Sequence, residues 1–431
     1  MNFPTNLGAI SRISSSWWIV FAGFVSIVFT FGVPTMVMPV IYAPIIDEFG
    51  WGRAQVTFVA TLKFGAGAVF GIFFGVIVDK LSIRKIVAVA SCLSAIAMLG
   101  FLWVQTLWQF YLVGLVLGMG SISCMIAIKV LVSQRFMHQQ GLAIGSALLG
   151  TSVAGIFTPP FATWLIGIYG WRMTVALLSI GIWTVALPVF LRIVKESEDA
   201  EIEGSGSADS SLQTKREESA AAEIDFSDVL RSRSFWMIGL AVSLIGFTDQ
   251  SLGQHLMLYL IQEVHYSPMD AAWIKSAVFG VSIAGKLGFG WLYDKLSVQG
   301  VMLCYFLMAV SVLLMFPLFI SSALVAFIIT RGLSHGGSIV DIPVLSKHCF
   351  GPKVLGKTIG ILTACVTIGF AIGPPLVGYM SDTQGSYRNA FIMLAVASIA
   401  AGLSLLGVKT TYRDRIIALE QSRVQASETS A

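Results

Sequence analysis

Charged residues are scarce in this chain. Of its 431 residues only 12% are Asp, Glu, Lys or Arg, whereas 56% are hydrophobic. Soluble globular domains typically carry about 25% charged residues. The composition therefore excludes an ordinary soluble protein and predicts a chain whose surface is solvated by lipid.

Motifs for covalent or metal chemistry are also lacking. The sequence shows no Walker-type phosphate loop and no nucleophile, metal or cofactor set, so we expect neither an enzyme nor an ATP-driven pump, and no cofactor or metal site. The five cysteines lack paired spacing, which indicates buried packing thiols rather than a disulfide framework. The net charge of +4 indicates membrane topology and anionic headgroups, and we expect no nucleic-acid partner.

Long apolar runs dominate instead. A helix rises about 1.5 Å per residue, so about 20 apolar residues cross the hydrocarbon core of a bilayer. Open sheets are excluded because lipid cannot satisfy unpaired backbone groups, and a closed barrel would show alternating polarity. We therefore expect an all-α membrane protein with twelve transmembrane helices. The runs are 17–42, 54–78, 86–106, 108–133, 141–168, 173–194, 235–262, 270–293, 300–319, 322–346, 354–380 and 388–408.

The two halves of the chain repeat each other. Asp79-Lys80-Leu81-Ser82 recurs 215 residues later as Asp294-Lys295-Leu296-Ser297, and the same offset places Pro159-Pro160 on Pro374-Pro375. Parallel repeats within apolar sequence are typical of membrane carriers, whose two copies enclose a substrate site. We therefore expect two repeats of six helices each.

Composition further divides the chain into four segments. We expect an N-terminal six-helix bundle at 1–195, a cytoplasmic linker at 196–234, a C-terminal six-helix bundle at 235–409 and a cytoplasmic tail at 410–431. The linker is rich in Glu, Asp, Ser, Gly and Ala, a composition that cannot bury enough apolar surface to fold.

Charge asymmetry predicts the orientation. If the first helix enters from the cytoplasm, most of the 27 Lys and Arg residues fall in cytoplasmic segments, whereas Arg53, Arg172 and Arg388 fall outside. By the positive-inside rule both termini are then cytoplasmic. The first helix is too long for the core of a signal peptide, so we expect it to be retained in a multi-pass protein of the cell membrane.

Several motifs resemble a known family. The loop Gly75-x-x-x-Asp79-Lys80-x-Ser82-x-Arg84-Lys85 resembles the signature loop of the major facilitator superfamily, with serine in place of the usual glycine. Further stretches look like its monocarboxylate porter branch and the oxalate/formate exchanger relatives. These are Phe49-Gly50-Trp51-x-Arg53, Pro159-Pro160, Tyr169-Gly170-Trp171-Arg172, His255-Leu256-x-x-Tyr259-Leu260 and Gly385-Ser386-Tyr387-Arg388.

That resemblance implies a rocker-switch carrier of small organic anions, often moved with a proton. In the family, the aspartate at the position of Asp79 caps the helix that corresponds to the span 354–380 and pairs with a basic residue such as Arg135, which holds the cytoplasmic gate shut. We expect Arg84 in the same loop and Asp294 in the second copy to serve this gate. Alternatively, both loops are simply tight cytoplasmic turns.

Lys286 is the strongest candidate for the substrate site. It lies eight residues before Asp294, which places it about 12 Å from the inner interface and close to the midplane. In the relatives, the helix that corresponds to the span 270–293 commonly carries an arginine at this position, which binds the substrate carboxylate. Lysine keeps the charge but loses the bidentate fork. An internal ion pair with Asp249 or Asp341, or snorkelling to the interface, are the alternatives.

Four more side chains complete the predicted substrate site. Arg331 and His335 share a face of the predicted span 322–346, where they would form a second anion contact or, alternatively, Arg331 would be a structural partner of an acidic residue. His255 and Tyr259 share a face of the predicted span 235–262, and the resemblance implies that this face points into the cavity. A histidine there would bind substrate or titrate near neutral pH, although an ordinary buried, hydrogen-bonded histidine is the alternative.

Proton coupling requires a titratable group within the membrane. Asp249 and Asp341 are the carboxylates available there. Three further lysines, Lys63, Lys129 and Lys275, fall toward the ends of their helices. Long lysine side chains snorkel to water from such positions, so we expect these three outside the site.

The favoured function is a secondary carrier of small organic carboxylates with proton-coupled uptake. Anion exchange and organic-acid efflux share these motifs, and a transport-inactive receptor would keep the binding charges. Helix 1 departs from the better-known animal branch, which carries a lysine after the proline, because Pro34 is followed by Thr35 here. The expected partners are the carboxylate, protons and the lipid bilayer, and we expect a monomer.

Overall fold

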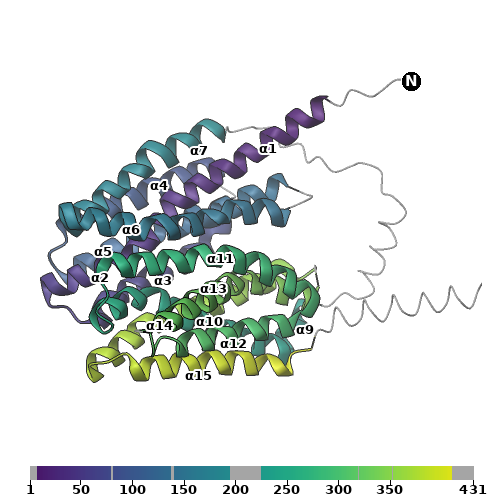
Figure 1. Cartoon of the computed structure of the whole chain (residues 1–431). Coiled ribbons are helices and arrows are strands. Elements are labelled where there is room, and N and C mark those ends of the chain that lie inside the picture. The colour runs from purple at the N-terminus through teal and green to yellow at the C-terminus, as the bar shows by residue number, and fades with distance from the viewer. Residues whose placement is uncertain are drawn as a thin grey trace, which may run out of the picture. The chain divides into compact units, whose positions relative to one another are not determined.

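The computed structural model describes residues 7–78, 81–136, 140–194, 225–318, 320–351 and 353–409. These residues form helices joined by short turns, and none of them lies in a strand (Figure 1). The predicted gating residue Asp79, most of the linker and the whole of the tail fall outside the described residues.

The predicted spans coincide with helical segments, which confirms the predicted fold class. The first half contains α1 (Leu7–Ser26), the π-helical η1 (Ile27–Gly32), α2 (Val33–Phe49), α3 (Arg53–Val78), α4 (Ile83–Gly100), η2 (Phe101–Trp103), α5 (Leu107–Arg135), α6 (Gln140–Gly181), η3 (Ile182–Ala186) and α7 (Leu187–Ile193). The second half contains α9 (Phe226–Arg231), α10 (Arg233–Gln262), α11 (Pro268–Leu296), α12 (Val298–Leu313), α13 (Ser321–Phe350), α14 (Leu355–Gln384), α15 (Arg388–Ser404) and η4 (Leu405–Gly407). The predicted span 300–319 was too long, because α12 ends at Leu313 and a turn follows.

Helix α6 covers two of the predicted spans. Gly170 interrupts it with φ +74°, a backbone conformation that glycine adopts without the steric cost of a Cβ atom. The break falls between the predicted spans 141–168 and 173–194. Together with η3 and α7, the apolar segment Leu142–Ile193 contains 52 residues, enough for two crossings.

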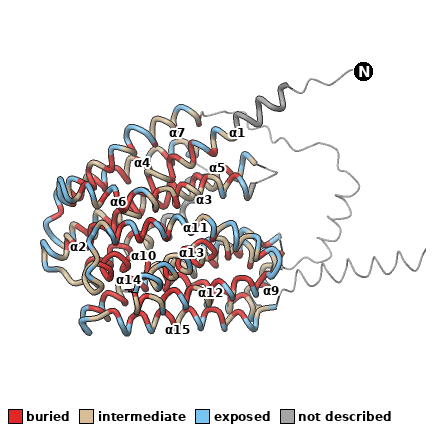
Figure 2. The backbone as a smooth tube through the Cα atoms, in the orientation of Figure 1, coloured by how far each residue is buried: buried red, intermediate tan, exposed pale blue. Residues whose placement is uncertain are grey.

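The surface of the described helices is apolar. Eight segments of the described residues are long and apolar enough to cross a membrane. Large side chains such as Trp103, Trp108 and Leu287 are exposed, at 68%, 63% and 71%. Buried and exposed positions follow one another along each helix (Figure 2). Exposed leucine and tryptophan at this density is expected where lipid, rather than water, surrounds the helices.

The chain forms two compact units. Unit 1 comprises Met1–Glu201, Ser251–Gly280 and Pro374–Tyr387, and unit 2 comprises Ile202–Gln250, Val281–Gly373 and Arg388–Ala431. The boundaries cut α10, α11 and α14, so each of these helices contributes to both units. The division into six-helix bundles at 1–195 and 235–409 stays a prediction.

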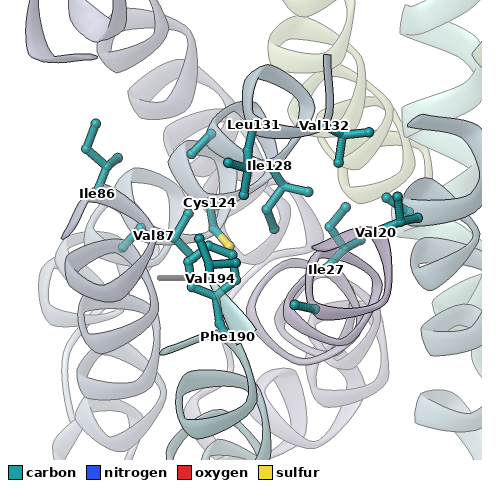
Figure 3. Close-up of a cluster of buried hydrophobic side chains, with 14 of the residues drawn as sticks. Val20, Ile27, Ile86, Val87, Cys124, Ile128, Leu131, Val132, Phe190 and Val194 are labelled. Carbon is teal, nitrogen blue, oxygen red and sulfur yellow. The ribbon is translucent and has the colours of Figure 1, made fainter. Parts of the chain in front are cut away.

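A core cluster in unit 1 surrounds Cys124 of α5. Ile27 from η1, Val87 from α4, Ile128 from α5 and Phe190 from α7 pack with it (Figure 3). All five side chains are 0% exposed. Cys124 is therefore a buried packing thiol, as the sequence predicts.

Glycines bring α3 and α5 into close contact within unit 1. A Cβ atom on Gly118 would overlap the backbone of Lys63, and one on Gly114 would overlap the side chain of Val59. Small residues allow helix backbones to approach in this way where no hydrophobic effect drives association. The contact fixes the stretch of α3 that carries Lys63.

Unit 2 is built around α12 and α13. Helix α12 packs against both α13 and α15. Helices α11 and α13 approach through a glycine on each side, because a Cβ atom on Gly285 would overlap the carbonyl of Leu333 and one on Gly336 would overlap the carbonyl of Ser282. This crossing sets the position of Lys286, which follows Gly285 on α11.

Candidate functional site

The buried charges of α10 and α13 form one cluster in unit 2. Arg331 donates through Nη1 to Oδ1 of Asp249 at 2.7 Å, and through Nη2 to the carbonyl oxygen of Asp249 at 3.1 Å. His335 lies one turn further along α13 and brings Nδ1 within 2.9 Å of the same Oδ1. Arg331 is 4% exposed and Asp249 is 9% exposed. Arg331 thus has an acidic partner on a neighbouring helix, which matches the structural alternative for this residue.

Asp341, the second predicted proton carrier, has a different environment. It is 1% exposed and accepts hydrogen bonds from the Tyr305 hydroxyl at 2.7 Å and from the backbone N–H of Ile342 at 2.6 Å. Within the described part of the chain no Lys, Arg or His pairs with it. Neutral donors alone satisfy this carboxyl group, whereas Asp249 has a cationic partner.

Lys286 is partly buried on α11. The backbone nitrogen of Lys286 lies against α13, since a Cβ atom on Gly336 would lie 2.6 Å from it. Asp249 pairs with Arg331, and Asp341 bonds to Tyr305. The two carboxylates considered as internal partners of Lys286 are therefore engaged elsewhere.

Arg84, Arg135 and Asp294 are the predicted gating residues that lie within the described ranges. Arg84 in the first turn of α4 donates through Nη2 to the carbonyl oxygen of Leu191 in α7 at 2.9 Å. Arg135 ends α5 and is exposed, and Asp294 in the last turn of α11 is exposed as well. Arg84 anchors α4 to α7 in unit 1, and the cytoplasmic gate itself stays a prediction.

His255 is 0% exposed in unit 1, and both of its ring nitrogens are engaged. Nε2 lies 2.8 Å from the carbonyl oxygen of Pro374, and Nδ1 lies 2.9 Å from the Tyr387 hydroxyl. Because a carbonyl only accepts, Nε2 carries the hydrogen and the neutral ring accepts at Nδ1 from the hydroxyl. The Tyr259 ring packs edge-on against that of Tyr387, with centroids 5.7 Å apart. His255 and Tyr259 thus belong to one aromatic cluster around Tyr387. This environment matches the alternative that His255 is an ordinary buried, hydrogen-bonded histidine.

Lys63 and Lys275 are both buried, whereas the sequence predicts that they snorkel to water. Lys275 is 2% exposed and Lys63 is 3% exposed. The Nζ of Lys63 donates to Thr35 Oγ1 at 2.5 Å and lies 5.6 Å from the ring centroids of both Phe31 and Phe64. Among the described residues no carboxylate lies within ion-pair distance of Lys63.

A small cavity in unit 1 adjoins this lysine. It is lined by Thr35, Met38, Tyr42, Val59, Ala60, Lys63, Gly114, Leu117 and Gln254. Tyr42, which is 0% exposed, donates its hydroxyl to Oε1 of Gln254 at 2.7 Å. The cavity therefore combines apolar walls with a lysine ammonium, a phenol and an amide.

Hydrogen bonds join the N-terminus of α3 to α10 and to the C-terminal part of α14 within unit 1. The Asp382 carboxylate accepts from the backbone N–H of Arg53 at 3.0 Å and of Ala54 at 2.9 Å. The Arg53 side chain donates through Nε to Oε1 of Gln262 at 2.8 Å and lies over the Tyr387 ring at 4.9 Å. A residue near the end of α14 thus caps the N-terminus of α3, where a negative charge is favoured.

The donor sets do not favour a metal centre. Within the described ranges no group of three or more His, Cys, Asp or Glu side chains is arranged to hold a metal ion. The buried polar side chains are instead enclosed between apolar, membrane-length helices, an arrangement typical of membrane transporters.

The chain belongs to the Major Facilitator Superfamily. The model of that family matches residues 19–346 and 300–430. The predicted membership in this superfamily is therefore confirmed. The related proteins and the proteins of similar fold are transporters, not enzymes.

Curated relatives match along most of the chain. Monocarboxylate transporter 13 of Rattus norvegicus is 25% identical over 415 residues, which cover 95% of this chain and 92% of the relative. Monocarboxylate transporter 12 of Rattus norvegicus is 22% identical over 443 residues, covering 95% and 89%. The resemblance to monocarboxylate porters thus extends to both halves.

Solved structures share the fold at lower identity. A bacterial homolog of the human lysosomal transporter Spinster, in an inward-facing and occupied conformation, matches with a TM-score of 0.67 and 16% identity over 93% of this chain and 95% of that chain. A nucleoside transporter matches with a TM-score of 0.69 and 13% identity over 90% and 99%. At these identities the likeness concerns the fold alone.

Proposed function

We propose that this protein is a secondary active transporter of small organic monocarboxylates that works by rocker-switch alternating access. The observation that carries this proposal is the match to monocarboxylate transporters over 95% of the chain. Buried cationic side chains in apolar helices agree with an anionic substrate, because a charge within the membrane normally pairs or faces a cavity. The cell membrane, with both termini cytoplasmic, is the proposed location, and a monomer is the proposed state.

Lys286 is the proposed carboxylate contact in unit 2. Arg331 and His335 on α13 both contact Asp249, and their proposed role is to support the substrate site. His255 and Tyr259 keep the cluster at Pro374 and Tyr387 in place. 

Asp341 is the better placed of the two proposed proton carriers. A buried carboxylate without a counter-charge costs much more than the same group carrying a proton. Asp341 has neutral donors around it, whereas the Asp249 carboxylate is balanced by Arg331. Binding of a proton to Asp341 would couple uptake of an anion to proton entry, which cancels the electrical cost of about 2.3 kcal/mol per charge at 100 mV.

Uptake into proteoliposomes tests the substrate class. We expect the purified protein to transport radiolabelled aliphatic or aromatic monocarboxylates and to ignore their neutral amides. The matched amides keep the shape of the acids and remove only the charge. Transport restricted to neutral or cationic compounds would contradict the proposal.

An imposed proton gradient tests the coupling. We expect an inward gradient to accelerate carboxylate uptake, a protonophore to abolish the acceleration, and Asp341→Asn to lose the gradient effect while retaining exchange. An Asp249→Asn variant serves as the comparison. If internal carboxylate stimulates entry and the gradient has no effect, the protein is an anion exchanger.

Substitution of Lys286 tests its assignment. Charge matters more than the shape of the donor group for a point-charge contact, so Lys286→Arg should retain more transport than Lys286→Gln. The comparison is made at equal membrane levels in proteoliposomes. Equal activity of the two variants would show that the charge of Lys286 has no part in binding.

A further inference from the structure

We infer that Lys63, together with Gln254, forms a second binding site for the substrate carboxylate, located in the cavity of unit 1. This inference rests on the proposed function, because it names where part of the transported anion binds. It starts from a lysine whose burial is nearly complete and whose charge no described carboxylate balances.

The hydrogen bonds around Lys63 leave donors available. A lysine ammonium carries three N–H groups. One of them donates to Thr35 Oγ1, and the Thr35 hydroxyl passes its own hydrogen to the carbonyl oxygen of Phe31 at 2.5 Å. The described contacts of Lys63 are otherwise the faces of Phe31 and Phe64. Two N–H groups of the ammonium therefore have no hydrogen-bond acceptor among the described residues.

Charge burial makes this arrangement costly without a ligand. A neutral hydroxyl and two phenyl rings compensate a buried ammonium only in part, since none of them carries a net negative charge. A charged group that is removed from water is normally paired. An anion in the adjoining cavity would supply the missing pair.

Gln254 offers the second contact on the cavity wall. It is 5% exposed, and its Oε1 accepts from the Tyr42 hydroxyl. That bond fixes the orientation of the amide and leaves its two Nε2 hydrogens without an acceptor among the described residues. A carboxylate between Lys63 and Gln254 would receive a charge-assisted bond from one and a neutral bond from the other.

The remaining cavity wall defines the substrate class. Met38, Val59, Ala60 and Leu117 are apolar, and Gly114 presents no side chain. Such walls favour an apolar group on the substrate and offer no cationic partner for a second carboxylate. The site therefore offers a contact for one carboxylate group and none for a second.

The packing of α5 keeps Lys63 at the cavity. Gly118 contacts the backbone at Lys63, and Gly114 contacts Val59 one turn earlier on α3. Any side chain at these two positions would push α3 away from α5. The glycines therefore position the lysine on the cavity wall.

The test compares Lys63→Gln with Lys63→Arg in ligand binding and transport. Acetate, lactate and benzoate are used as probes, and affinity is read from the rise in Tm of the detergent-purified protein and from KM in proteoliposomes. We expect Lys63→Gln to weaken apparent affinity about 10- to 100-fold, the range for loss of a hydrogen bond to a charged group. Lys63→Arg should recover part of that affinity, and Gln254→Leu should weaken it less than Lys63→Gln.

Lys275→Gln is the matched control. Lys275 is also a buried lysine of unit 1, at 2% exposure, but it donates to the carbonyl oxygen of Gly253 and does not line the cavity. We expect this variant to bind the probes with unchanged affinity. An equal loss of affinity in Lys275→Gln and Lys63→Gln would overturn the inference, because it would reveal a general effect of buried charge.

The two proposals fail in distinguishable ways. If the wild-type protein neither transports nor is stabilised by any carboxylate, the proposed function is wrong and the site falls with it. If carboxylates stabilise the wild type and Lys63→Gln to the same extent, only the Lys63 site is wrong. The Tm measurement decides even if Lys63→Gln is inactive in transport, because it does not depend on turnover.

Discussion

At the scale of single residues, Lys63 shows what the sequence could not reveal. Its place on α3 suggested a snorkelling side chain, because a lysine stem is long enough to reach water from there. The structure buries it through the contact of α3 with Gly118 of α5, and a sequence without aligned relatives does not show which helices touch. Thr35 of α2 takes the place of the lysine expected from the animal branch of the family, and its hydroxyl accepts a hydrogen bond from the Lys63 ammonium of α3.

Arg331 and Asp249 illustrate the opposite case. Hydropathy alone identified both as charges that need explanation within the membrane. The choice between substrate contact and ion pair depended on the distance between α10 and α13, which no spacing within one helix determines. At 2.7 Å the pair is formed.

The Arg331–Asp249 pair gives a prediction for stability. Removing one partner leaves a buried, uncompensated charge, so Arg331→Leu and Asp249→Leu should each cost about 3–5 kcal/mol, whereas the double variant should recover most of the loss. Tm of the purified protein measures the effect. Asp225→Asn is the control, because the Asp225–Lys353 pair is exposed, at 75% and 51%, and should leave Tm unchanged. Losses that simply add in the double variant would contradict the pairing.

At the scale of elements, the cap of a helix N-terminus can come from a residue that is distant in sequence. Helix α5 begins with a local capping box of Thr106 and Gln109, which a reader of the sequence is able to find. Helix α3 receives its capping carboxylate from Asp382, 328 positions beyond Ala54. Local sequence rules identified α3 as a helix but could not identify its cap.

Substitution of Asp382 should therefore affect α3. Losing an N-cap acceptor costs about 1 kcal/mol, so Asp382→Ala should lower Tm modestly, and Asp382→Asn should lower it less because the amide keeps one acceptor oxygen. The same variants should also change the rate of transport, since the bond joins α3 to α14. Ser267→Ala, which removes the local cap of Asp270 on α11, should lower Tm without changing transport. If both substitutions alter transport equally, the Asp382 bond has no special part in the cycle.

At the scale of the whole molecule, the helices could be predicted from the sequence, whereas their packing into compact units could not. The length of an apolar segment decides whether it spans the membrane, and this length can be counted directly in the sequence. The compact units mix segments of the two repeats, because the ends of α10, α11 and α14 pack in unit 1. Such packing depends on side-chain contacts between distant segments, and the recurrence of motifs does not report them.

The proposed orientation is tested with reporter fusions. By the positive-inside rule, alkaline phosphatase fused at the C-terminus should be inactive and a fluorescent protein there should fold, whereas phosphatase inserted at Gly385 should be active. Equal expression of both fusions is confirmed by immunoblot. The reverse pattern would place both termini on the outer side.

The cap at the start of α3 also provides a built-in reporter of motion. The amide hydrogens of Arg53 and Ala54 are held by Asp382 at 3.0 and 2.9 Å. Amide hydrogens exchange with solvent deuterium only when their hydrogen bonds open, so exchange at these two sites requires α14 to leave the end of α3. Their protection from exchange thus reports how stably this end of unit 1 is held.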